Sequence, residues 1–323
     1  MKRLQFFFAC FVGALFAPSI ATADDYPSRP VRLIVPFAPG GATDVVARAL
    51  SAGLSTKLGQ PVVVENRPGA GGIVAAQLVA NAKPDGYVLL MGSIGLLAII
   101  PNLRNDLPYD NDKSFAAVSP VSATPNVIVA HPSFVPNNVR ELIALARHAP
   151  GTISFGSSGT GTSTHLSGEL FEAMSGTKLV HVPYRGGSLA LTDLLAGQIP
   201  LQFDTMSSVA AIRSGKLKAI AVTSDKRSAL LPDVPTVAES GLPGYVATSW
   251  NGIIAPAGTP REIVTKLNGA IAQVLAMPEI TRSLSLDGSE VRTSSPEQFA
   301  TFIRDERERW GKLINSAHIT VTQ

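Results

Sequence analysis

Residues 31–44 read VRLIVPFAPGGATD, an apolar run followed by a short loop with two adjacent glycines. The run from Val31 to Phe37 has the length and the β-branched content of a buried strand. Behind the loop, apolar side chains recur at helical spacing from Val45 to Leu58, and Gly59 stands where a helix C-terminus is expected. The stretch therefore predicts a strand, a glycine-rich loop and a helix. Taken alone, the loop is either a tight turn or a binding loop.

The same unit recurs along the chain. Two further apolar runs in the first third, within 62–72 and 87–95, are each followed by a loop that contains glycine. A second set begins at 127–130, and its later runs lie at 153–155, 179–182, 201–203 and 219–223. Strands that alternate with helices predict an α/β fold in which mostly parallel sheets are flanked by helices.

The rhythm breaks at 224–244, which is rich in proline, glycine and charge and predicts a long surface connection. After it, Ser249 to Ala255 has the pattern of a strand, and two helices are expected before the C-terminus. Two sheets with their own helices and a returning tail predict two lobes with a ligand cleft between them. The expected boundaries are 24–124 plus 250–323 for lobe 1 and 125–249 for lobe 2.

The composition argues against several classes of function. The chain has 27 Lys+Arg against 24 Asp+Glu. Removal of an N-terminal segment with Lys2 and Arg3 would leave 25 against 24, a net charge of +1. A nearly neutral chain without a run of cations has no electrostatic surface for nucleic acid. The single cysteine, Cys10, lies in the same segment, so disulfides, cysteine nucleophiles and thiolate metal sites are not expected.

Residues 1–23 have the pattern of a cleaved signal peptide. A cationic start is followed by an apolar stretch from Leu4 to Phe16 and then by Ala21-Thr22-Ala23, the small residues that a signal peptidase needs. A membrane anchor is the alternative, although the apolar stretch is short for crossing a bilayer. We expect the mature chain to begin at Asp24 and to be a soluble, monomeric protein of the periplasm.

The glycine-rich loops follow the carboxyl ends of the predicted strands, where open α/β sheets bind ligands. Backbone N–H groups at helix N-termini are unpaired donors in a positive dipole field, which suits an anion. Two lobes that present such loops to each other would hold a small carboxylate from both sides, whereas the alternative for any one loop is a simple turn. The expected contacts are Gly40, Gly41, Thr43, Ser157, Ser158, Gly159, Gly161 and Thr162.

Side chains near these loops have two possible roles. Asp44 either contacts or gates the ligand or only complements the helix dipole. Asp204 either receives an ammonium group of the ligand or caps the helix expected near Met206. His165 is either a donor in the cleft or a structural histidine. The side chains expected to set the identity of the ligand are Phe37, Ser93, Asn126, Tyr184 and Asp204.

The sequence lacks the common motifs for catalysis and has no complete motif for metal binding. The sequence has no GxSxG elbow, no GxxxxGK(S/T) phosphate loop and no complete GxGxxG. His165 and Glu169 share a helical face, yet the other histidines have no matching zinc spacing. We therefore expect no catalysis, no metal and no cofactor. A hydrolase or isomerase that uses Asp44 or His165 as a general base is the alternative.

Six motifs, in order, resemble the Bug family, the extracytoplasmic solute receptors of tripartite tricarboxylate transporters. They are FAPGGATD, VVENRPGAGG, GSSGTGTSTHLSGELF, HVPYRGGSLALTDLLAGQI, LPDVPTVAESGLPG and APAGTP. The resemblance runs from about Tyr26 to near the C-terminus. Many relatives have proline where Ala38 stands and serine or asparagine around Thr160 and Thr162, differences expected to affect selectivity more than the grip on the carboxylate.

The resemblance implies a two-lobed periplasmic-binding-protein fold that closes on a small carboxylate. The solute would be a di- or tricarboxylate, an acidic amino acid or an aromatic acid, and the receptor would deliver it to membrane permease subunits. A receptor that docks on a signalling protein instead is an alternative that the sequence leaves open. The residues implied to hold the carboxylate are Gly40, Gly41, Ala42, Thr43 and Asp44 in one lobe and Ser157, Gly159, Gly161, Thr162 and His165 in the other.

Overall fold

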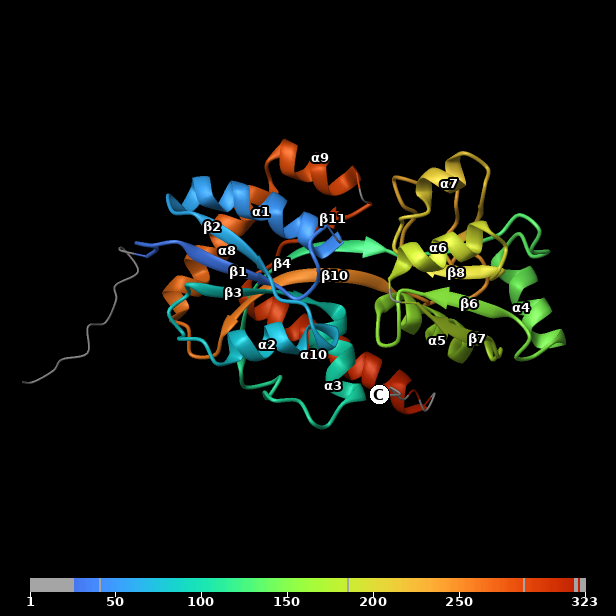
Figure 1. Cartoon of the computed structure of the whole chain (residues 1–323), viewed down its shortest axis with the longest axis horizontal. Helices are drawn as coiled ribbons and strands as arrows, with labels where there is room; N and C mark the ends of the chain where they lie inside the picture. Colours follow the sequence, from blue (N-terminus) through green and yellow to red (C-terminus); the bar gives the residue numbers. More distant parts are fainter. Residues whose placement is uncertain (1–25, 41, 185, 287, 317–318, 320–323) are drawn as a thin grey trace, which may run out of the picture.

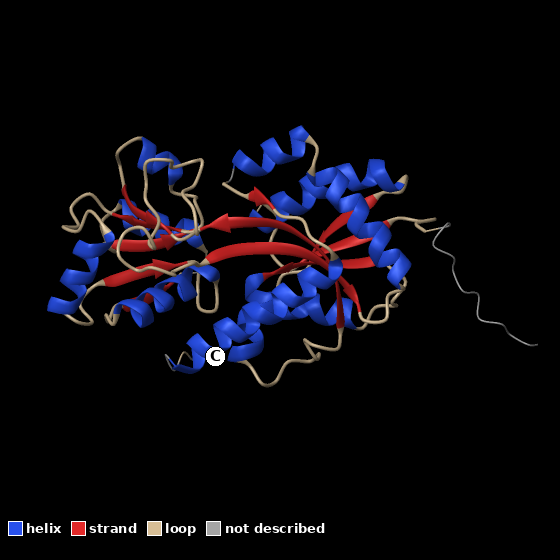
Figure 2. Cartoon of the chain, turned by 180° about the vertical axis from the view of Figure 1, so that it is seen from behind, coloured by secondary structure: helices blue, strands red, loops and turns tan. Residues whose placement is uncertain are grey.

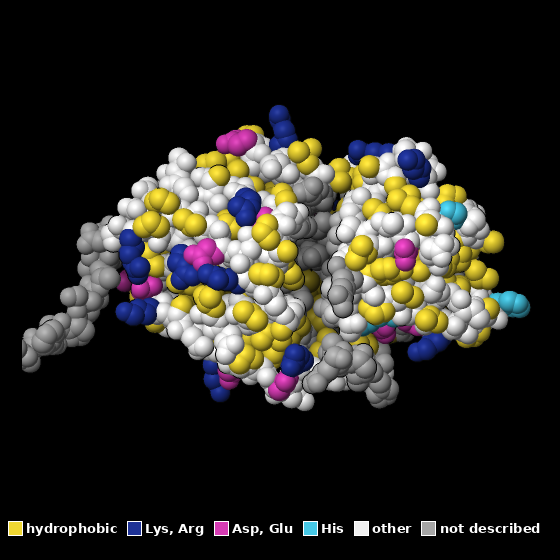
Figure 3. All heavy atoms as spheres, viewed as in Figure 1, with side chains coloured by type: hydrophobic (Ala, Val, Ile, Leu, Met, Phe, Trp, Pro, Cys, Tyr) yellow, Lys and Arg dark blue, Asp and Glu magenta, His cyan; other side chains and the backbone are white. Residues whose placement is uncertain are grey.

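The chain folds into two lobes, each built on one β-sheet covered by helices (Figure 1). The structure is a computed structural model that describes residues 26–40, 42–184, 186–286, 288–316 and 319. A furrow separates the two halves on the face shown in Figure 3. The expected signal segment 1–23 and the predicted ligand contact Gly41 lie outside the described residues.

The first lobe contains a six-stranded sheet in the order β11-β4-β10-β3-β1-β2. The half of the sheet that ends in the edge strand β2 is parallel, because β1 pairs in parallel with both β2 and β3. The remaining pairs are antiparallel: β10 lies between β3 and β4, and β11 pairs with β4. The strands are β1 (Val31–Val35), β2 (Val62–Asn66), β3 (Val88–Ser93), β4 (Phe115–Pro125), β10 (Thr248–Pro256) and β11 (Glu290–Val291).

Helices cover both faces of this sheet because successive side chains of a strand point to opposite sides. Leu33 and Val35 pack into the core under α1, whereas Ile34 belongs to the core under α2 and α10. The first face carries α1 (Ala42–Leu58), α8 (Arg261–Leu275) and α9 (Pro278–Leu286). The second carries the 3₁₀ turn η2 (Ala70–Gly72), α2 (Ile73–Ala80), the π turn η3 (Gly95–Ile99), α3 (Ile100–Leu103) and α10 (Pro296–Ser316).

The second lobe contains a five-stranded sheet in the order β7-β6-β8-β5-β9. Its α4 begins as the sequence predicts, because the Asn138 side chain accepts a hydrogen bond from the Glu141 N–H (3.0 Å). The strands are β5 (Val127–Ala130), β6 (Ser154–Ser157), β7 (Val180–Pro183), β8 (Leu201–Asp204) and β9 (Lys218–Val222). The helices are α4 (Val139–His148), α5 (Ser163–Ser175), α6 (Gly187–Leu195) and α7 (Val209–Arg213).

The predicted two-lobed α/β fold is confirmed, and both of its sheets are mixed in direction. The antiparallel strands β4, β5 and β10 are those that carry the chain between the lobes (Figure 2). The chain leaves the first lobe along β4 and returns along β10. These two strands therefore lie side by side and run in opposite directions. Parallel neighbours would instead need a crossover connection, usually a helix.

The two passages between the lobes are hydrogen-bonded to each other. The first is Asn126, between β4 and β5, and the second follows β9 through Thr223 and reaches β10 after Ala247. The Thr223 hydroxyl accepts from the Asn126 N–H (2.8 Å) and lies 2.6 Å from the Ala247 carbonyl oxygen. The expected lobe boundaries at 124/125 and 249/250 stay a prediction.

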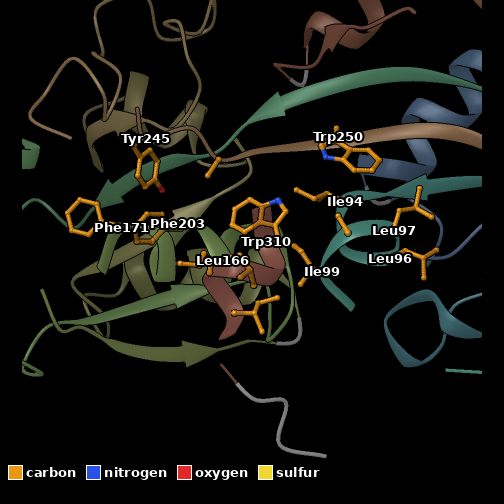
Figure 4. Packing of buried hydrophobic residues seen from close by; sticks show 14 of the residues in the cluster. Ile94, Leu96, Leu97, Ile99, Leu166, Phe171, Phe203, Tyr245, Trp250 and Trp310 are labelled. Atoms are coloured by element: carbon orange, nitrogen blue, oxygen red, sulfur yellow. The ribbon is translucent and has the colours of Figure 1, made fainter. Parts of the chain in front are cut away.

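One apolar core extends from the first lobe into the second (Figure 4). Trp250 of β10 and Trp310 of α10 belong to the same buried cluster as Leu166 and Phe203 of the second lobe. Helix α10 contacts η3 in the first lobe and α5 in the second. The lobes are thus joined along the side that carries α10, and the opposite side, with α1 and α6, is left for a cleft.

Candidate functional site

A cavity of about 660 Å³ lies between the lobes. This volume is within the range of small-molecule sites. The N-terminal ends of α1 and α6 reach it from opposite lobes. The described residues that line it are Gly40, Thr43, Val45, Val46, Thr124, Ser249, Asn251, Leu286 and Ser289 on one side and Gly187, Ser188, Thr205, Met206, Ser207, Val209, Ala210, Arg213 and Leu230 on the other.

The wall from the first lobe is the loop between β1 and α1. The side chain of Asp44 is buried, and its two oxygens accept from the Gly40 N–H, Arg48 Nε and Asn66 Nδ2, each at 2.8 Å. The hydrogen bond from Arg48, together with those from Gly40 and Asn66, lowers the pKa of Asp44 to about 2. Asp44 is therefore an anion that fixes the shape of the loop and complements the positive end of the α1 dipole.

The other predicted residues of the first lobe lie around this loop. Phe37 is partly exposed, and its carbonyl oxygen accepts from Asn66 Nδ2 (3.0 Å). Thr43 Oγ1 lines the cavity and donates to Asn251 Oδ1 (3.2 Å), which ties α1 to β10. Ser93 is buried at the end of β3, where its hydroxyl accepts from the Leu96 N–H (3.4 Å). Ala42 is the first residue of α1.

The wall from the second lobe is formed by the start of α6 and the loop between β8 and α7. Met206, at the centre of that loop, has a φ of 70°, a left-handed conformation that is costly for a residue with a side chain. Asp204 holds the loop: it is fully buried and accepts from the Ser207 hydroxyl (2.6 Å) and the Ser208 N–H (2.7 Å). Thr205 and Ser207 of this loop are among the residues that line the cavity.

The second predicted binding loop, 156–162, lies beside the cavity and closes largely on itself. The N–H of Gly159 donates to Ser157 Oγ (3.1 Å), and the N–H of Ser158 donates to Thr164 Oγ1 (2.9 Å). Thr162 caps α5 and donates to the Gly159 carbonyl (2.6 Å). Gly161 reaches the first lobe, where a Cβ built on Gly95 would lie 3.6 Å from its carbonyl oxygen.

His165 is buried under this loop. Its Nδ1 accepts from the Gly161 N–H (3.2 Å), and its Nε2 lies 3.3 Å from the Glu169 carboxylate. The ring stacks on His181 with centroids 3.9 Å apart. Burial, together with the neighbouring His165, lowers the pKa of His181 to about 4. The two stacked rings are packed within the second lobe, and neither histidine is among the described residues that line the cavity.

Two further predicted residues lie outside the described cavity lining. Tyr184 donates from its hydroxyl to Asp193 (2.8 Å), and burial and this bond raise the pKa of Tyr184 to about 12. Asn126 is fully buried in the passage between the lobes, and its amide nitrogen donates to Ser167 Oγ (2.9 Å). Its position makes it a structural part of that passage.

Several lining residues were missed by the sequence reading. Thr124, Ser249 and Asn251 come from β4 and β10, where polar residues interrupt the apolar ones. That interruption is the signal that could have marked them. Arg213, in the last turn of α7, carries no such signal, because a surface arginine at a helix C-terminus is common.

The electrostatics of the cavity suit an anion. Two helix N-termini bring unpaired N–H groups and partial positive charge from opposite sides. The described lining residues include hydroxyl and amide side chains, and none of them is acidic. Asp44 and Asp204, the nearby carboxylates, are already held by their own loops.

Two structural features of other protein classes are absent from the described residues. Within residues 26–40, 42–184, 186–286, 288–316 and 319, no helix is long and apolar enough to cross a membrane. In the same part of the chain, no group of three or more His, Cys, Asp or Glu side chains is arranged to hold a metal ion.

Two α/β lobes joined by crossing strands, with a polar cavity between them, define a two-lobed solute-binding protein. Residues 46–319 match the model of the tripartite tricarboxylate transporter family receptor. The chain therefore belongs to this receptor family. It is 37% identical to protein BugT of Bordetella pertussis over 316 residues, 97% of either chain.

Solved structures of similar proteins agree with this assignment. The R. palustris protein Rpa4515, solved with adipate, superposes with a TM-score of 0.82 at 37% identity over 92% of this chain and 99% of that one. The periplasmic binding protein BugD gives 0.79 at 38% identity, over 91% and 99%. MatC from Rhodopseudomonas palustris, with bound malate, gives 0.77 at 34% identity, over 90% and 100%.

Proposed function

We propose that this protein is a periplasmic receptor that captures a small carboxylate between its lobes and delivers it to the permease of a tripartite transporter. The observation that carries the proposal is the meeting of the α1 and α6 N-termini at a cavity whose described lining has no acidic side chain. Such ends bind anions through main-chain N–H groups without needing a lysine. The adipate and malate bound by two similar proteins support the same class of ligand.

Closure would follow from binding contacts on both lobes. A ligand shifts the balance toward a closed form only by its extra affinity for that form. The paired passages at Asn126 and Thr223 are the short segments about which the lobes would turn. The closed receptor would then present a surface made of both lobes to the permease, and residues 1–23 would direct the chain to the periplasm.

The proposal is one of binding without turnover. The alternative enzyme would use Asp44 or His165 as a general base, a role that needs a free proton acceptor within reach of the substrate. Asp44 is an anion that already accepts three hydrogen bonds, and His165 is buried under its own loop. Neither group is presented to the cavity.

Thermal unfolding with a panel of carboxylates tests the proposal. The chain from Asp24 onward is unfolded and refolded to remove any co-purified solute and then heated with each compound. A true ligand at a hundredfold excess over its Kd should add about 2.7 kcal/mol to the free energy of unfolding. Stabilisation by at least one carboxylate, with none by matched neutral amides, is the expected result; no stabilisation by any carboxylate would contradict the proposal.

A further inference from the structure

A second cavity, the rear cavity, has a volume of about 460 Å³ and lies on the α10 side of the strands that cross between the lobes. Strands β4 and β10 pair Ser249 with Thr124 and Trp250 with Ala123. The first pair lines the cavity between the lobes and the second pair lines the rear cavity, because successive side chains of a strand point to opposite faces. Asn251 is the one described residue that lines both. The volume of the rear cavity is within the range of small-molecule sites.

Aromatic rings form the floor and one wall of the rear cavity. Trp250 of β10 and Phe299 of α10 are buried, with ring centroids 6.1 Å apart. Phe302 follows one turn later on the same side of α10 and is 42% exposed, and its ring centroid lies 5.3 Å from that of Trp250. A large aromatic side chain left open beside a concave surface is typical of a binding site. The rear cavity therefore suits a ligand with a flat ring.

The lining of the rear cavity also contains a buried hydroxyl group without a partner. Ser122 of β4 is fully buried, and its Oγ makes no hydrogen bond within the described part of the chain. Such a group destabilises a protein unless a polar atom reaches it. A ligand whose ring carries a hydroxyl group would supply that atom next to the aromatic floor.

The rim of the rear cavity has one carboxylate and one guanidinium. Asp225, just beyond β9, is exposed and makes no hydrogen bond or ion pair with other described residues. Arg292 donates from Nη2 to Glu290 (3.1 Å), which leaves its other guanidinium N–H groups for a ligand. Glu290 also pairs with Lys226 (3.0 Å), the residue after Asp225, so these ion pairs bring the two rim segments together. One charge of each sign suits a zwitterion more than an anion, which Asp225 would repel.

The other described lining residues of the rear cavity are uncharged. Hydroxyl and amide groups among them can bond to the charged ends of a ligand, and the rest add apolar surface. They are Pro120, Val246, Thr248, Thr293, Ser294 and Gln298. The cavity between the lobes differs, because its described lining has no acidic side chain. The two cavities should therefore select ligands of different charge.

We propose that the rear cavity is a second ligand site and that it takes an aromatic α-amino acid with a ring hydroxyl group, of which L-tyrosine is the simplest. The ring lies against Phe302 above Trp250, and its hydroxyl group bonds to Ser122. The ammonium group pairs with Asp225 and the carboxylate with Arg292. This site does not depend on which solute the cavity between the lobes holds.

Isothermal titration calorimetry with matched compounds tests the inference. The refolded chain from Asp24 onward is titrated with L-tyrosine and with three compounds that each lack one of its groups. L-Phenylalanine lacks the ring hydroxyl, tyramine lacks the carboxylate, and 3-(4-hydroxyphenyl)propanoate lacks the ammonium group. We expect L-tyrosine to bind at least about threefold more tightly than each of the others, a gain typical of one added hydrogen bond or exposed ion pair.

Variants assign each contact. Ser122→Ala should remove the advantage of L-tyrosine over L-phenylalanine, Asp225→Asn its advantage over the propanoate, and Arg292→Gln its advantage over tyramine. Phe302→Ala should weaken all four compounds by at least about threefold, because each places its ring against that side chain. Asp233→Asn is the matched control and should behave as the parent, because it changes an exposed carboxylate of the same segment outside the lining.

A charge placed in the cavity between the lobes separates the two sites. Ser188, in the first turn of α6, lines that cavity and not the rear one. Ser188→Glu should weaken carboxylate binding between the lobes by like-charge repulsion and change the affinity for L-tyrosine by less than about twofold. Asp225→Asn should leave carboxylate binding between the lobes unchanged.

The outcomes distinguish the rear site from the receptor function. The inference is overturned if L-tyrosine does not bind the parent protein, or if its binding is lost in Ser188→Glu and kept in Asp225→Asn and Phe302→Ala. In either case the receptor function stands. Equal binding of L-tyrosine and L-phenylalanine would overturn the role of Ser122. If L-tyrosine binds as expected and no carboxylate stabilises the parent protein, the proposed function fails and the rear site stands.

Discussion

Two glycine-rich loops, one in each lobe, look alike in sequence and are used differently in the structure. Loop 36–44 lines the cavity with Gly40 and Thr43, whereas loop 156–162 stands beside it. In the second loop, the N–H groups of Ser158, Gly159 and Gly161 donate to side chains of that loop and of α5. The difference teaches that a glycine-rich loop can hold a ligand only with the N–H groups that its own side chains leave unused.

A new charge gives the largest expected difference between the two loops. Thr43→Glu places a carboxylate at the N-terminus of α1 inside the cavity and should weaken binding of a carboxylate ligand by about 100-fold or more, because like charges would be forced together. Thr160→Glu, the matched change in loop 156–162, should have less than about a threefold effect. Calorimetric Kd values measure both, and an equal loss in the two variants would erase the distinction between the loops.

The buried anion of the first loop gives the next effect. Asp44→Asn should lower the free energy of unfolding at pH 7 by about 2 kcal/mol, since the pKa of Asp44 is lowered from its usual 3.8 to about 2. A lowered carboxyl pKa stabilises the fold above the unfolded pKa, so the difference between the parent and the variant should disappear as the pH falls from about 4 to about 2.

Urea titrations of the parent and of Asp44→Asn across this pH range make the measurement. Arg48→Met removes one of the three hydrogen-bond donors to the Asp44 carboxylate. It should lower the free energy of unfolding by less than Asp44→Asn does. A constant difference between the parent and Asp44→Asn at every pH would show that the ionised carboxylate is not what stabilises the loop.

Stability also falls with falling pH beside the second loop, but in a higher pH window, through His181 of β7, whose Nε2 lies 2.6 Å from Ser157 Oγ of that loop. The pKa of His181 is lowered from 6.5 to about 4, so the folded state resists its protonation, and stability should fall as the pH drops through this window. Because His181 is partly exposed, we expect a loss of about 1 to 2 kcal/mol, less than the full shift implies.

His181→Gln should lack this dependence. The difference between the parent and the variant also cancels the opposing contribution of Glu172, whose pKa burial raises to about 6. Denaturant titrations between pH 7 and pH 4 test this, and an identical pH profile for the parent and His181→Gln would be the contrary result.

The smallest effect concerns two threonines. Thr43→Val removes the hydrogen bond to Asn251, and Thr162→Val removes the cap of α5. We expect Thr162→Val to cost about 1 kcal/mol of stability with little change in ligand affinity, and Thr43→Val to cost less stability but several-fold in affinity. Paired thermal unfolding and calorimetry measure both quantities. A larger loss of ligand affinity in Thr162→Val than in Thr43→Val would indicate that the binding loop is the one in the second lobe.

Much of the fold could be predicted from sequence because local signals agreed with it. Strand β1 lies within the run Val31 to Phe37, the helix expected over 45–58 lies within α1, and Asn138 caps α4. Strand β4 was not expected, because its sequence FAAVSPVSATP combines two prolines with small and polar residues. Such a strand forms because β10 pairs along its whole length, an interaction between residues far apart in the chain.

The site could be predicted only in part for the same reason. Gly40 and Thr43 were found because their loop has a local pattern, whereas Asn251 reaches the cavity only after β10 has crossed from the other lobe. The role of Asp44 depends on Asn66, which arrives from the neighbouring strand β2. The predicted contacts in 157–165 stay a prediction.

A crystal structure of the refolded protein with adipate, the compound with which the similar protein Rpa4515 was solved, tests the central claim most directly. We predict one carboxylate within about 3 Å of main-chain N–H groups in the first turns of both α1 and α6, so that residues near Thr43 and Ser188 hold the same anion. A carboxylate bound to only one lobe, or held at loop 156–162 away from α1 and α6, would contradict the account.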